Sequence, residues 1–241
     1  MTTTTQLEIR SPLEAGSGTV GGPLFPVGLV VTGRPCLVVG GGPVAARKVR
    51  SLLRCGATVT MVAPDVGEAL RLLLDDGAAE DHRDALVVLA RPYQRGEAAG
   101  YRLVVTATGD PAVDAAVYED AERAGVWVNS ADDPANCSMV LPAVWRTGVV
   151  TVSVSTDGTS PALSAWLRNL VAEAIGPHIG ELAALLGGVR RTLRDEGRRT
   201  DAVDWSAILE GPAPSLVAEG RIAEAEAAIR TGLGSTQLER S

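Results

Sequence analysis

The sequence predicts an α/β protein built on a doubly wound parallel sheet, followed by a β-hairpin and helix region and a small helical C-terminal part. Three observations support this prediction. Short apolar runs alternate with helical patterns up to about residue 130, as expected of parallel strands buried on both faces. Three consecutive glycines follow the first of these runs. Beyond residue 132 the pattern changes to two β-rich runs joined by a short turn, which is typical of a hairpin.

Each element of the alternating part follows from its local pattern. Strands are expected where short apolar runs are bounded by Gly, Pro or polar residues, at residues 36–39, 58–62, 85–90, 102–107 and 126–129. Helices are expected where apolar residues recur at helical spacing, at residues 43–54, 66–74 and 111–124. Pro43 and Pro111 stand at first helical positions, where a missing N–H costs nothing.

The later part is expected to form a separate unit. The segments SMVLPAVW and VVTVSVS, joined by the turn RTG, predict the hairpin. A helix follows from Pro161, with Ser160 as N-cap, and its wide apolar stripe favours packing against another subunit. Two more helices are expected over residues 182–193 and 222–229, separated by a loop over residues 210–215.

Composition excludes several classes of function. The net charge of −7 disfavours a nucleic-acid partner, which requires a basic surface. The three cysteines are widely spaced, so neither disulfides nor a structural metal site is expected. The apolar stretches are too short to span a bilayer, and the polar first residues lack the pattern of a signal peptide. We therefore expect a cytoplasmic protein without a membrane partner.

The glycine run fits a dinucleotide-binding fingerprint. Gly40, Gly42 and Ala45 match G-x-G-x-x-G/A between a predicted strand and a helix that opens at Pro43, the context of a Rossmann-like fold. Gly42 is expected to let a pyrophosphate approach the backbone at the helix N-terminus. We assign cofactor binding to the whole loop, namely Gly40, Gly41, Gly42, Pro43 and Val44. A glycine run by itself is also compatible with a plain turn.

The neighbouring strand ends complete the expected cofactor edge. The second strand ends in Ala63 and Pro64, and no acidic residue stands where a ribose-binding carboxylate is usual, since Asp65 comes slightly late. The choice between NAD and NADP therefore stays open from the residues alone. Thr106 and Ala107 end the fourth strand, Thr108 follows it, and all three are expected to line the nicotinamide side. A simple strand-to-helix connection capped by Asp110 is the alternative.

A pair of aspartates follows the last parallel strand. Asn129 ends this strand, and Asp132 and Asp133 lie on the next loop, which Pro134 stiffens. A carboxylate at this edge can serve as a general base or as a ligand for a metal ion. An ordinary turn is the simpler explanation of Asp-Asp-Pro considered by itself.

Four segments together carry a specific resemblance: LFPVGLVVTGRPCLVVGGGPVAARKVRSLLRCGATVTMVAP, VVTATGDPAVD, VNSADDPANCSMVLPAV and VSVSTDGTSPALSAWLR. In this order and spacing they resemble the precorrin-2 dehydrogenase family. Its bifunctional members are also sirohydrochlorin ferrochelatases and form the amino-terminal module of siroheme synthases. The resemblance covers about residues 24–179. It implies NAD-dependent oxidation of precorrin-2 to sirohydrochlorin, insertion of Fe²⁺ in bifunctional members, and a homodimer.

The resemblance also assigns roles to residues. The family's essential aspartate falls on Asp132, which would take a proton as hydride leaves for the nicotinamide, and Asn129 matches on its N-terminal side. Residues expected to bind the carboxylate-rich tetrapyrrole are Ser138, Ser155, Thr156, Gly158, Thr159, Ser160 and His178. Asp157 departs from the family, where glycine is usual, and its negative charge would oppose such a substrate. Its backbone is expected to occupy the left-handed region.

The expected organisation has four parts: a tail at residues 1–22, an NAD-binding Rossmann domain at 23–137, a dimerisation region at 138–178 and a helical domain at 179–241. No fixed metal site is expected, and chelatase activity is left open. The rival hypothesis is a regulatory module that senses NAD(H) without turnover. Such a sensor would not need a carboxylate directed at the nicotinamide.

Overall fold

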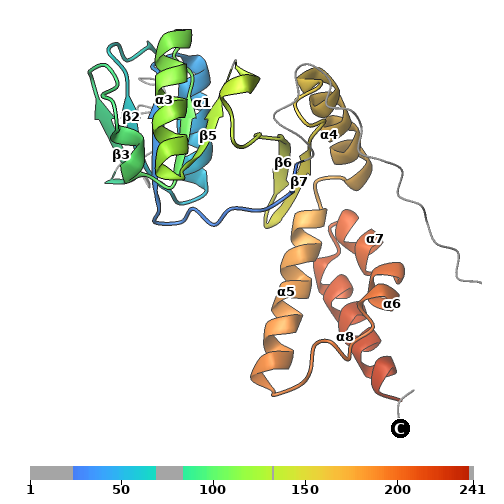
Figure 1. Cartoon of the computed structure of the whole chain (residues 1–241). Coiled ribbons are helices and arrows are strands. Elements are labelled where there is room, and N and C mark those ends of the chain that lie inside the picture. The colour runs from blue at the N-terminus through green and yellow to red at the C-terminus, as the bar shows by residue number, and fades with distance from the viewer. Residues whose placement is uncertain (1–23, 69–83, 132, 239–241) are drawn as a thin grey trace, which may run out of the picture. The chain divides into compact units, whose positions relative to one another are not determined.

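The computed structural model describes residues 24–68, 84–131 and 133–238, which form two compact units. The first contains the described residues up to Leu141 together with Asp157–Thr159, and the second contains Pro142–Thr156 and the residues from Ser160 onward. Each unit is described separately below, with the elements labelled as in Figure 1.

The first unit is built on a five-stranded parallel sheet, which confirms the predicted fold class. The strand order is β3-β2-β1-β4-β5. The chain adds β2 and β3 on one side of β1, and then β4 and β5 on its other side, so the order switches between β1 and β4. The strands are β1 (Pro35–Val39), β2 (Thr58–Val62), β3 (Leu86–Leu89), β4 (Leu103–Thr106) and β5 (Trp127–Ser130). Ligands of doubly wound sheets bind at this switch point, beyond the carboxyl ends of the strands.

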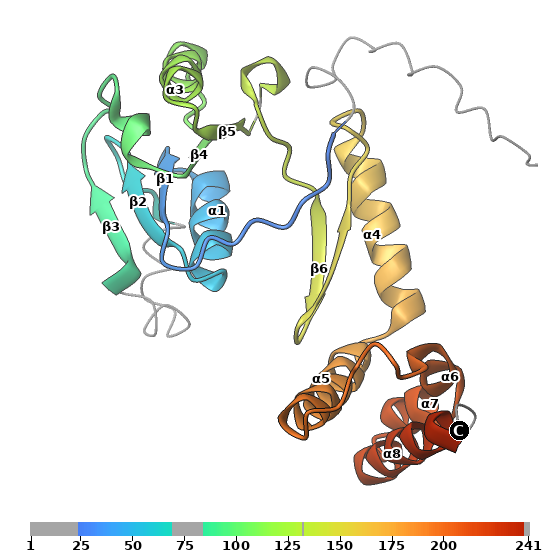
Figure 2. The same cartoon turned by 60° about the horizontal axis from the view of Figure 1, so that its bottom comes forward.

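Two helices cover opposite faces of the sheet (Figure 2). Side chains of β1 alternate between the faces: Cys36 and Val38 pack with α1 (Pro43–Arg54), whereas Leu37 and Val39 pack with α3 (Pro111–Ala124). The helix expected over residues 66–74 falls mostly outside the described residues. The described residues of the unit also include the 3₁₀ helices η2 (Glu97–Gly100), before β4, and η3 (Pro134–Asn136), after β5.

The second unit begins with the predicted hairpin. β6 (Ala143–Thr147) and β7 (Val150–Val154) are antiparallel, and α4 (Pro161–Ile175) packs against both. The turn consists of Gly148 and Val149, so Arg146 and Thr147 of the segment RTG belong to β6. Gly148, with φ of 53°, supplies the left-handed conformation of the turn. A side chain at Gly180 would crowd the Thr147 carbonyl, so the start of the next helix passes close to the hairpin end.

The rest of this unit is helical. The helices are α5 (Ile179–Asp195), α6 (Trp205–Glu210), α7 (Ala213–Ala218) and α8 (Ile222–Leu238), and they bury a shared core of nine residues: Leu182, Val189, Leu193, Ile208, Ala213, Val217, Ala225, Ile229 and Leu233. The prediction of a loop over residues 210–215 is wrong, because α7 begins at Ala213. Pro212 suits a helix start, and burial of Ala213 and Val217 stabilises the turn that follows.

In the described part of the chain, no single helix has both the length and the apolar composition of a membrane span. Only α4 and α5 taken together meet that test, and they are bent by 64° relative to one another.

Candidate functional site

The three glycines after β1 have different neighbours. A Cβ added to Gly40 would overlap the carbonyl oxygen of Ala107, and one added to Gly41 would overlap that of Asp65. A Cβ on Gly42 would have no atom within 4 Å. Gly40 and Gly41 are therefore required by protein backbone packed against them, whereas the space beside Gly42 is open to a ligand.

The N-terminus of α1 offers unused hydrogen-bond donors beside this space. Gly42 is the N-cap residue, and no side chain caps the helix. α3 also begins with a proline, but there Asp110 accepts hydrogen bonds from the N–H groups of Ala112 and Val113. An uncapped helix start with an open approach is the arrangement that binds a phosphate group in dinucleotide-binding folds. The structure thus places Gly42, Pro43 and Val44 together at an open, uncapped helix start.

The loop after β2 folds back onto the glycines. Ala63 is buried, and the exposed Pro64 and Asp65 follow it. The N–H of Gly67 donates a hydrogen bond of 3.1 Å to the carbonyl of Gly41, which holds this loop beside the glycine-rich turn. The Asp65 carboxylate therefore belongs to a segment in direct contact with the fingerprint, although its sequence position comes later than usual.

A buried carboxylate organises the end of β4. Thr106 is fully buried, and its hydroxyl donates a hydrogen bond to Asp114 of α3. The hydroxyl of Thr108 donates to the same oxygen at 2.6 Å. The N–H of Ala107 donates to the Val39 carbonyl at 2.8 Å, which fastens the loop to β1. Sequence reasoning missed Asp114, because its role depends on partners that the sheet brings to it.

The end of β5 is held by a thiol. Cys137 Sγ accepts a hydrogen bond from the Ser130 N–H at 3.1 Å and donates to the Ser130 carbonyl at 3.3 Å. Burial raises the pKa of this thiol, so it stays protonated and able to donate. The amide of Asn129 donates to the Met139 carbonyl at 3.1 Å, and the hydroxyl of Ser138 accepts from the Val128 N–H at 3.0 Å. These contacts join residues 137–139 to the end of β5, which the sequence alone did not predict.

Of the two aspartates of this loop, the structure describes Asp133. Asp133 accepts hydrogen bonds from the Ala135 N–H at 3.0 Å and the Asn136 amide at 2.7 Å, so it is the N-cap of η3. Asp132 lies outside the described residues. Ser130, two positions earlier, carries the one buried side-chain oxygen in the described ranges that has no hydrogen-bond partner. An orphaned buried hydroxyl is uncommon, and sequence reasoning gave no signal for it.

Five of the residues expected to bind the tetrapyrrole lie in the segment just before α4, over residues 155–160. Ser160 caps this helix by accepting from the Leu163 N–H, and the Thr156 hydroxyl donates to the Ser160 carbonyl at 3.0 Å. Asp157 adopts φ of 51° and Gly158 φ of 79°, as the left-handed turn requires. Ser155 and Thr159 are exposed. The prediction that an aspartate can occupy the glycine position of this turn is confirmed.

His178 lies apart from that turn, at the start of α5. Its carbonyl accepts the N–H groups of Glu181 and Leu182, and its exposed side chain makes no capping hydrogen bond. Within residues 24–68, 84–131 and 133–238, no group of three or more His, Cys, Asp and Glu side chains is placed to hold a metal ion.

Comparisons with known proteins agree with this geometry. Residues 27–143 match the family described as putative NAD(P)-binding. The siroheme synthase of Methylococcus capsulatus is 36% identical over 204 residues, which are 84% of this chain and 42% of that protein. The siroheme synthase of Pseudomonas putida strain W619 is 37% identical over 194 residues, 79% of this chain and 40% of that protein. The chain thus spans about two fifths of the length of these relatives.

One solved structure has the same fold. The structure described as SirC, precorrin-2 dehydrogenase, superposes with a TM-score of 0.61 over 89% of this chain and 99% of that one, at 23% sequence identity. The shared features include the parallel sheet, the hairpin and the C-terminal helices.

Proposed function

Because the chain belongs to the family that forms the amino-terminal module of siroheme synthases, with an NAD(P)-binding domain as its first unit, we propose that it oxidises precorrin-2 to sirohydrochlorin with NAD. The identity of 36% over 204 residues to a siroheme synthase is the observation that carries this proposal. The open, uncapped edge at Gly42 supports it, because a dehydrogenase must hold a dinucleotide.

In this proposal the loops at the carboxyl ends of the strands bind different parts of the cofactor. The N–H groups at the start of α1 bind the pyrophosphate, and the ends of β4 and β5 receive the nicotinamide half. When bound there, the cofactor supplies a hydride acceptor. Asp132 accepts the proton that the macrocycle loses as its hydride departs, so the two electrons leave with the hydride and the proton leaves separately. Asn129 and Cys137 keep the loop of Asp132 attached to β5.

NAD rather than NADP is proposed as the cofactor. The Asp65 segment contacts the fingerprint through Gly41, and residues 60–68 contain no arginine that could pair with a 2′-phosphate. A carboxylate near the adenosine ribose accepts hydrogen bonds from its hydroxyls and repels a 2′-phosphate.

The tetrapyrrole is proposed to bind through hydroxyl and backbone donors. Ser138, Ser155, Thr156, Gly158, Thr159, Ser160 and His178 are the candidates that the resemblance supplies. Thr156 and Ser160 already hold the turn before α4 together, so their hydroxyls serve the loop first, and the backbone N–H groups of the turn are the better donors to a carboxylate.

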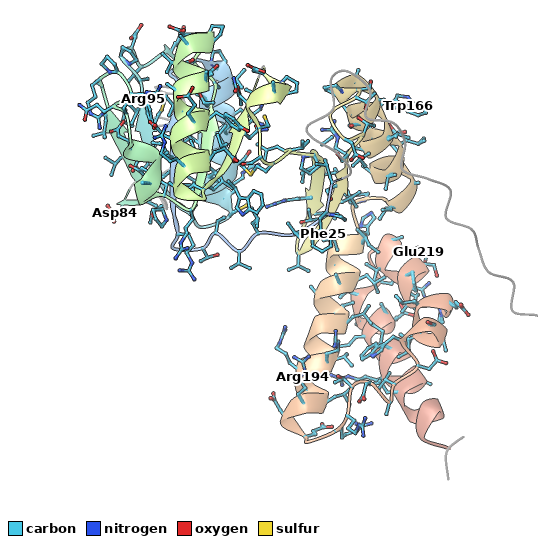
Figure 3. The ribbon with its side chains drawn as sticks, in the orientation of Figure 1. Phe25, Asp84, Arg95, Trp166, Arg194 and Glu219 are labelled. Carbon is cyan, nitrogen blue, oxygen red and sulfur yellow. The ribbon has the colours of Figure 1, made fainter. Side chains whose placement is uncertain are left out.

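A homodimer is proposed for the assembly. Three large apolar side chains on α4 are 45% to 59% exposed within one chain: Leu163, Trp166 and Leu170. Trp166 projects from this helix in Figure 3. An exposed stripe of this size is typical of a protein interface. A second copy of the chain would bury it.

The deciding experiment is anaerobic incubation of the protein with enzymatically generated precorrin-2 and NAD⁺, followed through the visible spectrum of sirohydrochlorin. Parallel reactions contain NADP⁺ in place of NAD⁺, or added Fe²⁺ to test for chelation. Formation of sirohydrochlorin with NAD⁺ is the expected result. Binding of NAD⁺ without any conversion would contradict the dehydrogenase and favour the NAD(H)-sensing alternative.

A further inference from the structure

Asp114 is a buried carboxylate for which the proposed reaction has so far supplied no role. It is 5% exposed and lies in the first turn of α3. Side chains with this charge are rarely so buried unless a cation pairs with them. Among the described residues, Asp114 takes part in no ion pair, whereas the equally buried Asp120 on the same helix pairs with Arg95 and Arg123. In the described part of the chain, the Asp114 carboxylate is compensated by hydroxyl donors and by the positive end of the helix dipole.

Capping of α3 does not explain this carboxylate. Asp110 already accepts the N–H groups of Ala112 and Val113 at the helix start. The side chain of Asp114 instead turns towards the sheet and accepts the hydroxyl protons of Thr106 and Thr108 at a single oxygen. Apolar side chains in place of Asp114, Thr106 and Thr108 would stabilise the fold at least as well. Stability alone therefore gives no reason for a carboxylate at this position.

The two threonines hold the backbone that joins neighbouring strand ends. On one side, the Ala107 N–H bonds to the Val39 carbonyl, and the Ala107 carbonyl lies against Gly40. On the other side, the Ala131 N–H donates a hydrogen bond of 2.9 Å to the Thr106 carbonyl, which links β4 to the loop that carries Asp132. The segment from Thr106 to Thr108 therefore lies between the phosphate-binding turn and the start of the loop after β5. Its orientation affects both.

We propose that Asp114 is a positioning residue for dinucleotide binding: by holding the hydroxyls of Thr106 and Thr108, it fixes the backbone of this segment for the nicotinamide half of the cofactor. The inference rests on the proposed function only in so far as the ligand is NAD(H). A segment fixed before binding loses less conformational entropy when the ligand arrives, so affinity rises without any contact between Asp114 and the ligand.

The test compares three alanine and asparagine variants by direct titration with NAD⁺ and NADH. Asp114→Ala is expected to weaken binding at least about tenfold, a change of about one decade in Kd. Asp114→Asn keeps an acceptor oxygen for both hydroxyls and is expected to stay within about threefold of the wild type. Asp120→Ala is the matched control. It removes an equally buried aspartate from α3 and is expected to lower the unfolding temperature while leaving Kd unchanged.

A second variant covers the case in which Asp114→Ala does not fold. Thr106→Val removes one of the two hydroxyls at a position that is 0% exposed, so any loss of affinity must act through the backbone and not through ligand contact. Hydrogen exchange of the amides of residues 107–109 in the ligand-free protein should be faster in both Asp114→Ala and Thr106→Val, and unchanged in Asp120→Ala.

Three outcomes would overturn the inference. These are an unchanged Kd in Asp114→Ala, an equal loss of affinity in Asp120→Ala, or failure of Asp114→Asn to restore binding. The proposed reaction fails by a different result, namely a wild-type protein that binds NAD⁺ and leaves precorrin-2 unchanged. That result would not affect the comparison of Asp114 variants, because the comparison is made on binding alone.

Discussion

The carbonyl oxygen of Ala107 occupies the space that a side chain on Gly40 would need. Gly40 also adopts φ of 125°, which side chains rarely allow. Gly42, two residues later, has φ of −79° and no atom near its missing Cβ. The first glycine therefore serves the fold, and the last is free to serve a ligand.

The pair Gly40→Ala and Gly42→Ala should separate these roles. Gly40→Ala is expected to lose at least about 2 kcal/mol of unfolding free energy, because it adds both backbone strain and an overlap with Ala107. Gly42→Ala is expected to stay within about 1 kcal/mol of the wild type and to lose most of its NAD⁺ affinity. Chemical denaturation and NAD⁺ titration of both variants check this. A stable Gly40→Ala protein, or full NAD⁺ affinity in Gly42→Ala, would contradict the assignment.

Asp132→Asn should lower the rate of precorrin-2 oxidation without weakening cofactor binding. If Asp132 accepts the substrate proton, loss of its carboxylate should lower kcat/KM for precorrin-2 by at least about a hundredfold. Asp133→Asn is the matched control, because asparagine also caps helices and the charge change is the same. Its rate should remain close to that of the wild type. Equal rates in the two variants would rule out Asp132 as the base.

Ser130→Ala should stabilise the ligand-free protein or leave its stability unchanged. The buried Ser130 hydroxyl has no partner among the described residues, and a buried unsatisfied polar group costs about 1–3 kcal/mol. Its removal is therefore expected to raise the midpoint of thermal unfolding. Calorimetry of both proteins without ligand measures the change. A clear loss of stability would mean that the hydroxyl has a partner, such as a bound water molecule.

The Asp120 network should make the first unit sensitive to acid. Although burial acts to raise it, the pKa of Asp120 falls from the ordinary 3.8 to about 2, because the Gly96 N–H, Arg123 and the Tyr93 hydroxyl bind the carboxylate, with Arg95 adding its charge. A folded-state pKa below the unfolded value stabilises the protein above that unfolded value. This contribution is complete above pH 3.8 and is lost as the pH falls through about 2.

Asp120→Asn is the matching test of the acid sensitivity. The variant should be less stable than the wild type at neutral pH, and the difference should shrink as the pH is lowered. Urea unfolding between neutral pH and the lowest pH at which both proteins fold gives the two curves. Parallel curves would exclude a contribution from this carboxylate.

Trp166→Glu should weaken the proposed dimer. Trp166 is 59% exposed on α4 within one chain, and a charge there would be buried without a partner in a symmetric interface. Trp127→Glu is the control, because Trp127 is 55% exposed at the start of β5 in the other unit. Sedimentation velocity should show a smaller species for Trp166→Glu alone. A monomeric wild type would contradict the assembly itself.

Most of the local structure could be predicted from the sequence, and the prediction that failed has a physical reason. The strands and the hairpin were found because burial on two faces and tight turns leave patterns within a few residues. The loop expected over residues 210–215 was wrong because Gly and Pro suggest a break there, whereas burial of Ala213 and Val217 in the helical core favours α7. The helix expected to end at Ile229 continues to Leu238.

The sequence by itself determined the order of the elements, the glycine-rich turn after β1 and the resemblance to the family, since each depends on residues close together in the chain or on motifs in a fixed order. Only the tertiary structure decided which glycine faces backbone and which faces open space, and that Asp114 and Cys137 hold the ends of β4 and β5. The physical reason is the strand order. It places β4 beside β1 and β5 beside β4, and so joins residues far apart in the chain. No local pattern records these contacts.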